Sequence, residues 1–135
     1  MNSHSPYDDG VRRTGDVVII NLLNALENRT ATSKYRPAVL IRRDAGHWVT
    51  MGLTTNRHYR DRTARMQVPD PTAIGLRGPG WLWGHRLANI SAIDVHDHIG
   101  RVDGAMAEAI IELARLDALD AAALRLAATS SAAAA

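Results

Sequence analysis

Two alternating segments between residues 36 and 55, joined by a short polar turn, limit the possible fold of this chain most. Arg36-Pro37-Ala38-Val39-Leu40-Ile41 leads from a basic loop into an apolar run, and Arg43-Asp44-Ala45-Gly46 has the composition of a turn. Alternate residues of a strand face opposite sides, so Val39 and Ile41 share one face and Arg36 lies on the other. This pattern predicts a surface loop that carries an arginine directly into a core strand.

The second segment, residues 47 to 55, has the same alternation. It places Val49, Met51 and Leu53 on the core face, whereas Trp48, Thr50, Gly52 and Thr54 face the other way. If the two strands pair, Arg36 and Thr54 both avoid the core face.

The remaining apolar runs are short and lie between turn-forming residues, as in a sheet of small strands. They are residues 17–23, 64–68, 81–90 and 99–102. Asp103 is a candidate N-cap for a helix from Ala105 to about Leu126, with Met106, Ile110 and Leu113 at helical spacing. Five or more strands followed by one terminal helix predict a small α+β domain with an antiparallel, barrel-like sheet.

The length of 135 residues is typical of a single domain. We expect a flexible lead-in over residues 1–13, one domain over 14–126 and a low-complexity, Ala-rich tail over 127–135. The chain has no cysteine, which excludes disulfides and thiolate metal sites and makes a cytoplasmic location the default expectation. No apolar run approaches the roughly 18 residues of a membrane span, and the polar N-terminus does not resemble a secretory signal.

The net charge of +2 hides a strongly basic segment between residues 28 and 65. Nine Lys or Arg residues there face only Asp44 and Asp61, and Lys34 is the one lysine in the whole chain. Arginine suits bidentate phosphate contacts better than lysine does. The segment therefore fits an electropositive face for nucleic acid, although a solvated edge in an arginine-rich proteome gives the same composition.

The order of the short motifs resembles the PemK/MazF family of toxin–antitoxin toxins. The matching pieces are Gly15-Asp16-Val17-Val18, Arg36-Pro37-Ala38-Val39-Leu40-Ile41, Gly52-Leu53-Thr54-Thr55, Trp81-Leu82-Trp83 and Ile99-Gly100-Arg101-Val102. The resemblance covers roughly residues 14 to 116. It implies a dimeric, SH3-like antiparallel β-barrel of five to seven strands with a C-terminal helix. It also implies metal-independent cleavage of single-stranded RNA without a cofactor, and inhibition by a cognate antitoxin whose disordered tail crosses the substrate groove.

The resemblance assigns catalysis to Arg36, before the proline, and to Thr54, at the end of the third strand. When a ribose 2′-OH attacks its own phosphate, the transition state is doubly negative, and an arginine fork stabilises that charge. A threonine hydroxyl is too weak a base to take the proton, so we expect Thr54 to orient the phosphate. Many members carry an acidic residue where this chain has His85, so the chain has either exchanged its proton carrier or lost efficient cleavage.

Residues around these positions are candidates for contact with RNA. The expected phosphate and base contacts are Arg29, Lys34, Tyr35, Arg57, His58, Arg60, Arg62 and Arg86, and Trp48 and Tyr59 are further candidates for base stacking. Asp94, His96, Asp97 and His98 suggest a metal site, but histidines two apart in a turn lack defined further ligands, so we expect no metal.

Two other functions fit the same architecture. A CcdB-like inhibitor of DNA gyrase would need no arginine–threonine pair and would bind its target near the C-terminal helix. A catalytically silent RNA-binding module would bind RNA in a strongly salt-dependent way and release no products.

Overall fold

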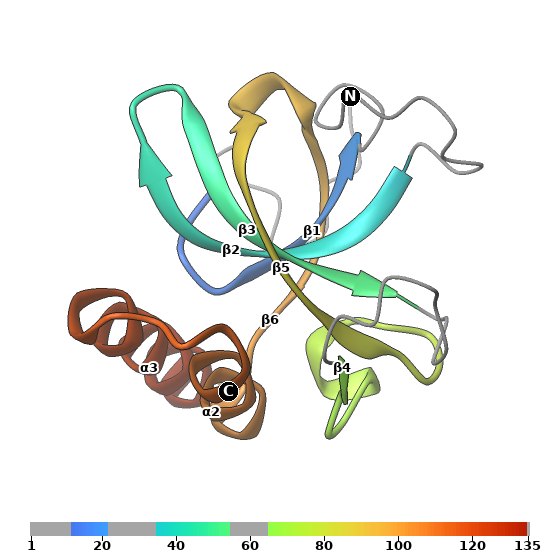
Figure 1. Ribbon diagram of the computed structural model, residues 1–135. Coiled ribbons are helices and arrows are strands. Elements are labelled where there is room, and N and C mark those ends of the chain that lie inside the picture. Colours follow the sequence, from blue (N-terminus) through green and yellow to red (C-terminus); the bar gives the residue numbers. More distant parts are fainter. Residues whose placement is uncertain (1–11, 22–34, 55–64, 135) are drawn as a thin grey trace.

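The computed structural model describes residues 12–21, 35–54 and 65–134. The strands are β1 (Asp16–Asn21), β2 (Tyr35–Asp44), β3 (His47–Thr54), β4 (Arg65–Gln67), β5 (Trp81–Ser91) and β6 (Val95–Arg101). Two 3-10 turns, η1 (Thr72–Ile74) and η2 (Ala92–Asp94), flank β5, and the helices α2 (Gly104–Ala114) and α3 (Ala118–Ala134) end the chain. In Figure 1 the two helices lie side by side at the lower left, below the sheet, and β4 lies at the lower right.

The described strands form one six-stranded sheet in the order β4-β5-β3-β2-β1-β6, and all described pairs are antiparallel. The α+β class and the number of strands are therefore as predicted. The sheet is strongly twisted (Figure 1), and β4 and β6 lie at its two ends without a described pairing that would close it into a barrel.

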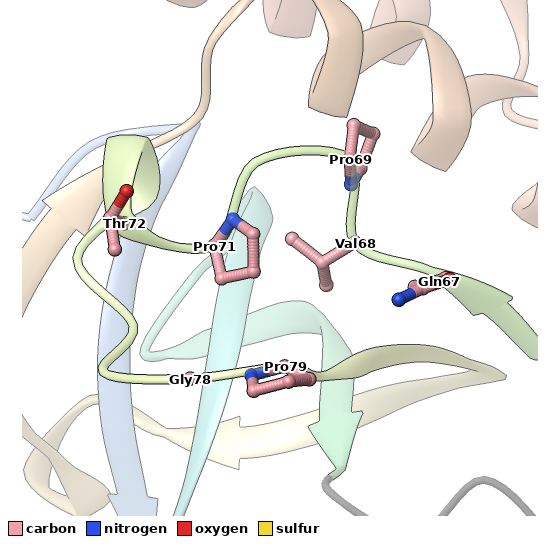
Figure 2. Close-up of a pocket in the computed structure, with 7 residues that line it drawn as sticks. All are labelled: Gln67, Val68, Pro69, Pro71, Thr72, Gly78 and Pro79. Atoms are coloured by element: carbon pink, nitrogen blue, oxygen red, sulfur yellow. The ribbon is translucent and has the colours of Figure 1, made fainter.

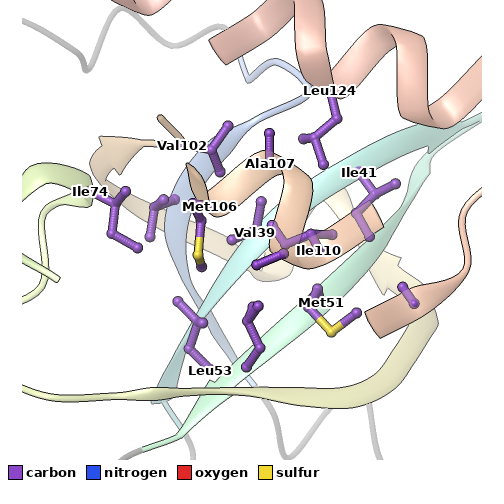
Figure 3. Packing of buried hydrophobic residues seen from close by; sticks show 14 of the residues in the cluster. Val39, Ile41, Met51, Leu53, Ile74, Val102, Met106, Ala107, Ile110 and Leu124 are labelled. Atoms are coloured by element: carbon purple, nitrogen blue, oxygen red, sulfur yellow. The ribbon is translucent and has the colours of Figure 1, made fainter. Parts of the chain in front are cut away.

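The main core lies between one face of the sheet and the two helices. Val39, Ile41, Met51 and Leu53 from the strands pack with residues of the helices, including Met106, Ala107, Ile110 and Leu124 (Figure 3). These strand residues are the ones that the alternation assigned to the core face, so that prediction is confirmed.

The opposite face of the sheet is also apolar and buried, which the alternation alone does not reveal. Its residues come from five strands and are Val18, Ile20, Ala38, Leu40, Trp48, Ile90 and Val95. The prediction that Trp48 stacks on RNA bases is wrong, because Trp48 is only 3% exposed within this second cluster. Its indole packs against the other residues of this cluster and is not accessible to a base.

The C-terminal region forms two helices, whereas one continuous helix was predicted. Asp103 caps α2 as expected, because its Oδ1 accepts a hydrogen bond from the Met106 backbone N at 2.8 Å. The helix ends at Arg115, which has a left-handed conformation (φ 52°). Asp117 then caps α3 through a 2.8 Å hydrogen bond from the Asp120 backbone N. Aspartate stabilises a helix more at its N-cap than in its interior, so Asp117 favours the start of a second helix.

Two further boundaries differ from the prediction. α3 runs through the Ala-rich stretch to Ala134, and Ala127 and Ala128 are buried. β6 begins at Val95, so His96, Asp97 and His98 belong to a strand and not to a turn. Among the described helices, none has the length and apolar content to cross a membrane.

Candidate functional site at the fork between two strands

The predicted site lies where β2 and β3 separate. The described pairing between them ends at Ala38 and Gly52; beyond it, Arg36 pairs with Ile20 of β1, and Thr54 pairs with Trp81 of β5. The start of β2 and the end of β3 diverge visibly (Figure 1). Pro37 stands at the point of separation, where its missing N–H removes a hydrogen-bond donor from the ladder.

A cavity of about 550 Å³ occupies this fork. Pro37 lines it from β2, Leu53 and Thr54 line it from β3, and the segment from Leu76 to Trp81 completes the wall. The cavity is within the size range of small-molecule sites, about 300–1,000 Å³.

The loop that forms the far wall is held by close backbone packing between η1 and β6. Gly75 has a left-handed backbone (φ 93°), and a Cβ placed on it would lie 2.0 Å from the Ile99 carbonyl oxygen. A Cβ on Gly100 would likewise lie 2.2 Å from the Ile74 carbonyl oxygen. Only glycine fits at both positions, so this contact fixes the loop that faces the fork.

Arg36 directly precedes Pro37 in β2 and is partly buried, but it is not one of the residues that line the cavity. It faces away from Pro37, on the sheet face that carries Ile20 and Ala38. Its Nε is buried, and within the described part of the chain no acceptor receives a hydrogen bond from it. A buried charged donor without a partner is costly, which makes Arg36 a candidate for binding an anion.

Two more unpartnered polar atoms gather near Arg36, where β1 ends and β2 and β6 begin. They are Asn21 Oδ1 and His96 Nε2, both buried and without a hydrogen-bond partner in the described structure. Tyr35, which is 46% exposed, meets the His96 ring edge to face with 5.4 Å between the ring centroids. This corner therefore offers a donor, an acceptor and an accessible aromatic ring within a few residues of Arg36.

The described structure brings some predicted site residues together and leaves others undetermined. Arg36 and Thr54 lie at the ends of the two forking strands, and Tyr35 adjoins Arg36 at an exposed position. His85 and Arg86 lie in β5, where Arg86 pairs with Met51 and Leu82 pairs with Leu53, leaving an irregular stretch around His85. The predicted contacts outside the described residues are Arg29, Lys34, Arg57, His58, Tyr59, Arg60 and Arg62.

Two cations of the basic segment have internal roles instead. Arg42 NH1 lies 3.4 Å from Asp120 Oδ2 of α3, and Arg43 donates a hydrogen bond from Nε to the Ala45 carbonyl at 3.3 Å. These contacts link β2 to α3 and close the β2–β3 turn, so neither arginine belongs to the fork.

The acidic and histidine residues near 96 do not assemble into a metal centre. Among the described residues, no three His, Asp or Glu side chains lie close enough together to hold a metal ion. His98 instead contacts Asp16, with 3.3 Å between Nε2 and Oδ1.

Sequence reasoning missed Asn21, His96 and the cavity wall from Leu76 to Trp81 as parts of one region. Asn21 did carry a signal, because it is the single polar residue within the apolar run of residues 17–23. The cavity wall carried none, since its position depends on the pairing of Trp81 with Thr54 and on the packing of Gly75 against β6.

No protein-family model matches the chain, and no curated protein matches it.

Proposed function

We propose that the protein is a metal-independent endoribonuclease of a toxin–antitoxin system, which cleaves single-stranded RNA at the β2–β3 fork. The observation that carries the proposal is the buried Nε of Arg36, which has no hydrogen-bond partner in the described structure and lies where the pairing of β2 with β3 ends. A phosphate at this place would accept the hydrogen bond that Arg36 has available, and charge-assisted bonds of this kind are strong.

The chemistry needs no group beyond those of the chain and the RNA. The ribose 2′-oxygen attacks the adjacent phosphorus and gives its proton to a base, while the bond from phosphorus to the 5′-oxygen breaks. The leaving 5′-oxygen takes up a proton, so the products are a 2′,3′-cyclic phosphate and a 5′-OH. Arg36 stabilises the extra negative charge on the phosphate, and Thr54 orients it. The need for a 2′-OH restricts cleavage to RNA.

His85 is the proposed proton carrier, because an ordinary imidazole changes charge near neutral pH. Replacing it tests this role separately from phosphate binding. We expect His85→Gln to lower the cleavage rate at pH 7 by about 100-fold, the lower end of the usual contribution of general acid–base catalysis. The dependence of rate on pH should flatten in this variant. An unchanged profile would remove His85 from the mechanism and leave the proton carrier open.

The remaining parts of the proposal concern assembly and location. The curved sheet would be the SH3-like barrel of PemK/MazF toxins, two copies would form the active homodimer, and the protein would act in the cytoplasm. A cognate antitoxin with a disordered tail would cover the fork. The test is co-expression with the neighbouring reading frame, which should restore growth that the toxin alone arrests.

The direct test of the activity is incubation of the purified protein with a long RNA in the presence of EDTA, followed by analysis of the new ends. We expect fragments that end in 2′,3′-cyclic phosphate and begin with 5′-OH, and about 1,000-fold slower formation of them with Arg36→Ala. Arg43→Ala is the matched control, because it removes the same charge from the same strand outside the fork. If the RNA stays intact, salt-sensitive RNA binding would indicate a silent module, and capture of gyrase would indicate a CcdB-like inhibitor.

A further inference from the structure

A cluster of charged side chains is buried where β1 begins and β6 ends, outside the fork between β2 and β3. Its members are Asp16, His98 and Arg101, whose side chains are 1%, 4% and 16% exposed. Histidine ordinarily changes its charge between about pH 5 and 8, so the net charge of this cluster can respond to pH. The proposed cleavage chemistry uses none of these three residues.

The ring of His98 has two acceptors within reach of one N–H group. Its Nε2 lies 2.8 Å from the Gly100 carbonyl oxygen, which can only accept a hydrogen bond, so Nε2 carries the hydrogen. The same nitrogen lies 3.3 Å from Asp16 Oδ1, a buried atom without a hydrogen-bond partner in the described structure. The ring therefore donates to the Gly100 carbonyl, and a carboxylate oxygen lies beside it as a second acceptor.

A proton on the other ring nitrogen changes the balance between these two acceptors. A hydrogen bond between charged groups is about twice as strong as one between neutral groups, so the imidazolium favours Asp16 over the Gly100 carbonyl. Arg101 Nε lies 3.6 Å from the same Oδ1 but makes no hydrogen bond to an acceptor in the described structure. The carboxylate oxygen is thus available to the charged ring.

The other charges near His98 come from β6 and from the segment before β1. The charged and titratable groups of the described residues around this junction are Asp16 of β1, His96, Asp97 and Arg101 of β6, and Arg12 and Arg13 before β1. η1 and α3 approach it through Ile74 and Ala127, which are uncharged. Because Asp97 is exposed, Asp16 is the buried negative charge that attracts the imidazolium.

Gly100 also carries the contact that holds the loop of residues 75–81. β6 has a bulge at Ile99, between the pairs that His98 and Gly100 make with β1. η1 packs directly on this bulge, since a Cβ placed on Gly100 would lie 2.2 Å from the Ile74 carbonyl oxygen. A change in the orientation of the Gly100 carbonyl therefore displaces the start of the loop.

The loop has room to follow such a displacement. Gly78 and Pro79 line both the fork cavity and a second cavity of about 470 Å³. Figure 2 shows Val68 and Pro71 across this second cavity from Gly78 and Pro79. A Cβ on Gly78 would meet no atom within 4 Å, so this part of the loop lacks the close packing that would fix its position.

We propose that His98 is a proton-operated switch for the loop that walls the fork cavity. The neutral ring bonds to the Gly100 carbonyl and holds the loop against β6, whereas the protonated ring bonds to Asp16 and releases the loop. Acid therefore loosens the cavity wall. The inference holds for any ligand of the fork, so it can fail or succeed separately from RNA cleavage.

The experiment follows two NMR signals of the full-length protein without RNA, between about pH 5 and 8. The Gly100 carbonyl carbon reports the hydrogen bond that its oxygen accepts. 5-Fluorotryptophan at Trp81 reports the far end of the loop, and among the three tryptophans its resonance is assigned by its loss in Trp81→Phe. We expect both signals to move in one step, at the pH at which the His98 ring itself titrates.

Two histidine variants and one aspartate variant identify the group responsible. His98→Gln keeps an N–H that can donate to the Gly100 carbonyl but gains no proton, so both signals should stay at their neutral-pH positions. His47→Gln is the matched control, because His47 is exposed at the start of β3 and should leave the step unchanged. Asp16→Asn should move the step to lower pH, since it removes the negative charge that stabilises the imidazolium.

The switch is overturned if the His98 ring titrates while the Gly100 and Trp81 signals stay fixed, or if His98→Gln shows the same step as His47→Gln. It is also overturned if the ring does not titrate before the protein unfolds in acid. If His98→Gln does not fold, the natural protein decides: one common midpoint for the three signals supports the switch, and different midpoints contradict it. A protein that shows the switch and cuts no RNA would retain this inference and lose the proposed function.

Discussion

A charged side chain lies at each end of β1: Asp16 is buried, and Arg36 of the neighbouring β2 is partly buried, but only Asp16 has its charge paired within the described structure. At the start of β1, Asp16 is 1% exposed, and two cationic or potentially cationic groups lie beside its Oδ1: His98 Nε2 at 3.3 Å and Arg101 Nε at 3.6 Å. Its Oδ2 accepts a hydrogen bond from the Arg13 backbone N at 2.8 Å. At the other end, Arg36 pairs in register with Ile20 and keeps a buried Nε without an acceptor.

This difference separates a structural charge from a functional one. The charge of Asp16 is paired within the chain, although its Oδ1, like Arg36 Nε, has no hydrogen-bond partner in the described structure. This charge pairing stabilises the junction of β1 and β6. The guanidinium of Arg36 has no partner at Nε, and this lowers the stability of the fold. A protein keeps such a costly group where a site must bind an anion. We therefore expect mutation of Arg36 to affect activity and mutation of Asp16 to affect the stability of the fold.

The largest expected effect is the loss of RNA cleavage when Arg36 is replaced. Arg36→Ala should lower the RNA cleavage rate by about 1,000-fold, the lower end of what a transition-state arginine contributes. Arg36→Met should be equally inactive yet no less stable to urea than the natural protein, because it removes a buried donor that has no partner. A loss of stability that explains the inactivity would show that Arg36 is structural, like Asp16.

Replacement of Asp16 should instead lower the stability of the fold. Asp16→Ala leaves His98 and Arg101 beside a missing carboxylate and should lower the free energy of unfolding by about 3 kcal/mol. Urea denaturation measures this change, with the exposed Asp44→Ala at the end of β2 as control. If Asp16→Ala unfolds at the same urea concentration as the control, the compensated end contributes nothing to stability.

A smaller effect on activity is expected from the hydroxyl group of Thr54. Thr54→Val keeps the shape of the side chain but removes a hydrogen bond to a charged group, which should slow cleavage about tenfold. Thr54→Ser should restore most of the rate, since it returns the hydroxyl. Equal rates in the valine and serine variants would argue that Thr54 contributes shape alone.

The smallest expected effect concerns a charge pair outside both ends of β1. Arg125 donates hydrogen bonds of 2.8 and 2.9 Å to the Glu108 carboxylate and lowers the pKa of Glu108 below its ordinary value. A lowered pKa stabilises the fold above the unfolded-state value, and the contribution disappears as pH falls through the folded-state pKa. NMR titration should show the Glu108 pKa rising in Arg125→Gln, with little change in stability because both side chains are exposed.

The sequence predicted most of the fold because its alternation separates the two faces of each strand, although both faces of β3 are buried. The assignment of Val39, Met51 and Leu53 to the core and the cap at Asp103 rest on local patterns that the structure retains. The second helix was missed because Asp117 lies at an apolar position of the helical repeat. Its role as an N-cap depends on the turn at Arg115.

The candidate site was predictable only in part. Arg36 and Thr54 lie at matching ends of two adjacent strands, and such a pairing of adjacent strands can be inferred from sequence. The fork, its cavity and the unpartnered atoms of Asn21 and His96 depend on where the pairing of β2 with β3 ends and on where η1 meets β6. Contacts between segments so distant in sequence leave no periodic pattern.

The most direct test of the central claim is the NMR signal of the Arg36 side-chain Nε–H, assigned by its loss in Arg36→Lys. Titration with a non-cleavable 2′-O-methyl RNA should shift this signal and slow its exchange with water, because a phosphate then accepts the hydrogen bond that the free protein lacks. RNA that binds and leaves both properties of the Arg36 signal unchanged would contradict the claim that Arg36 is held for an anion.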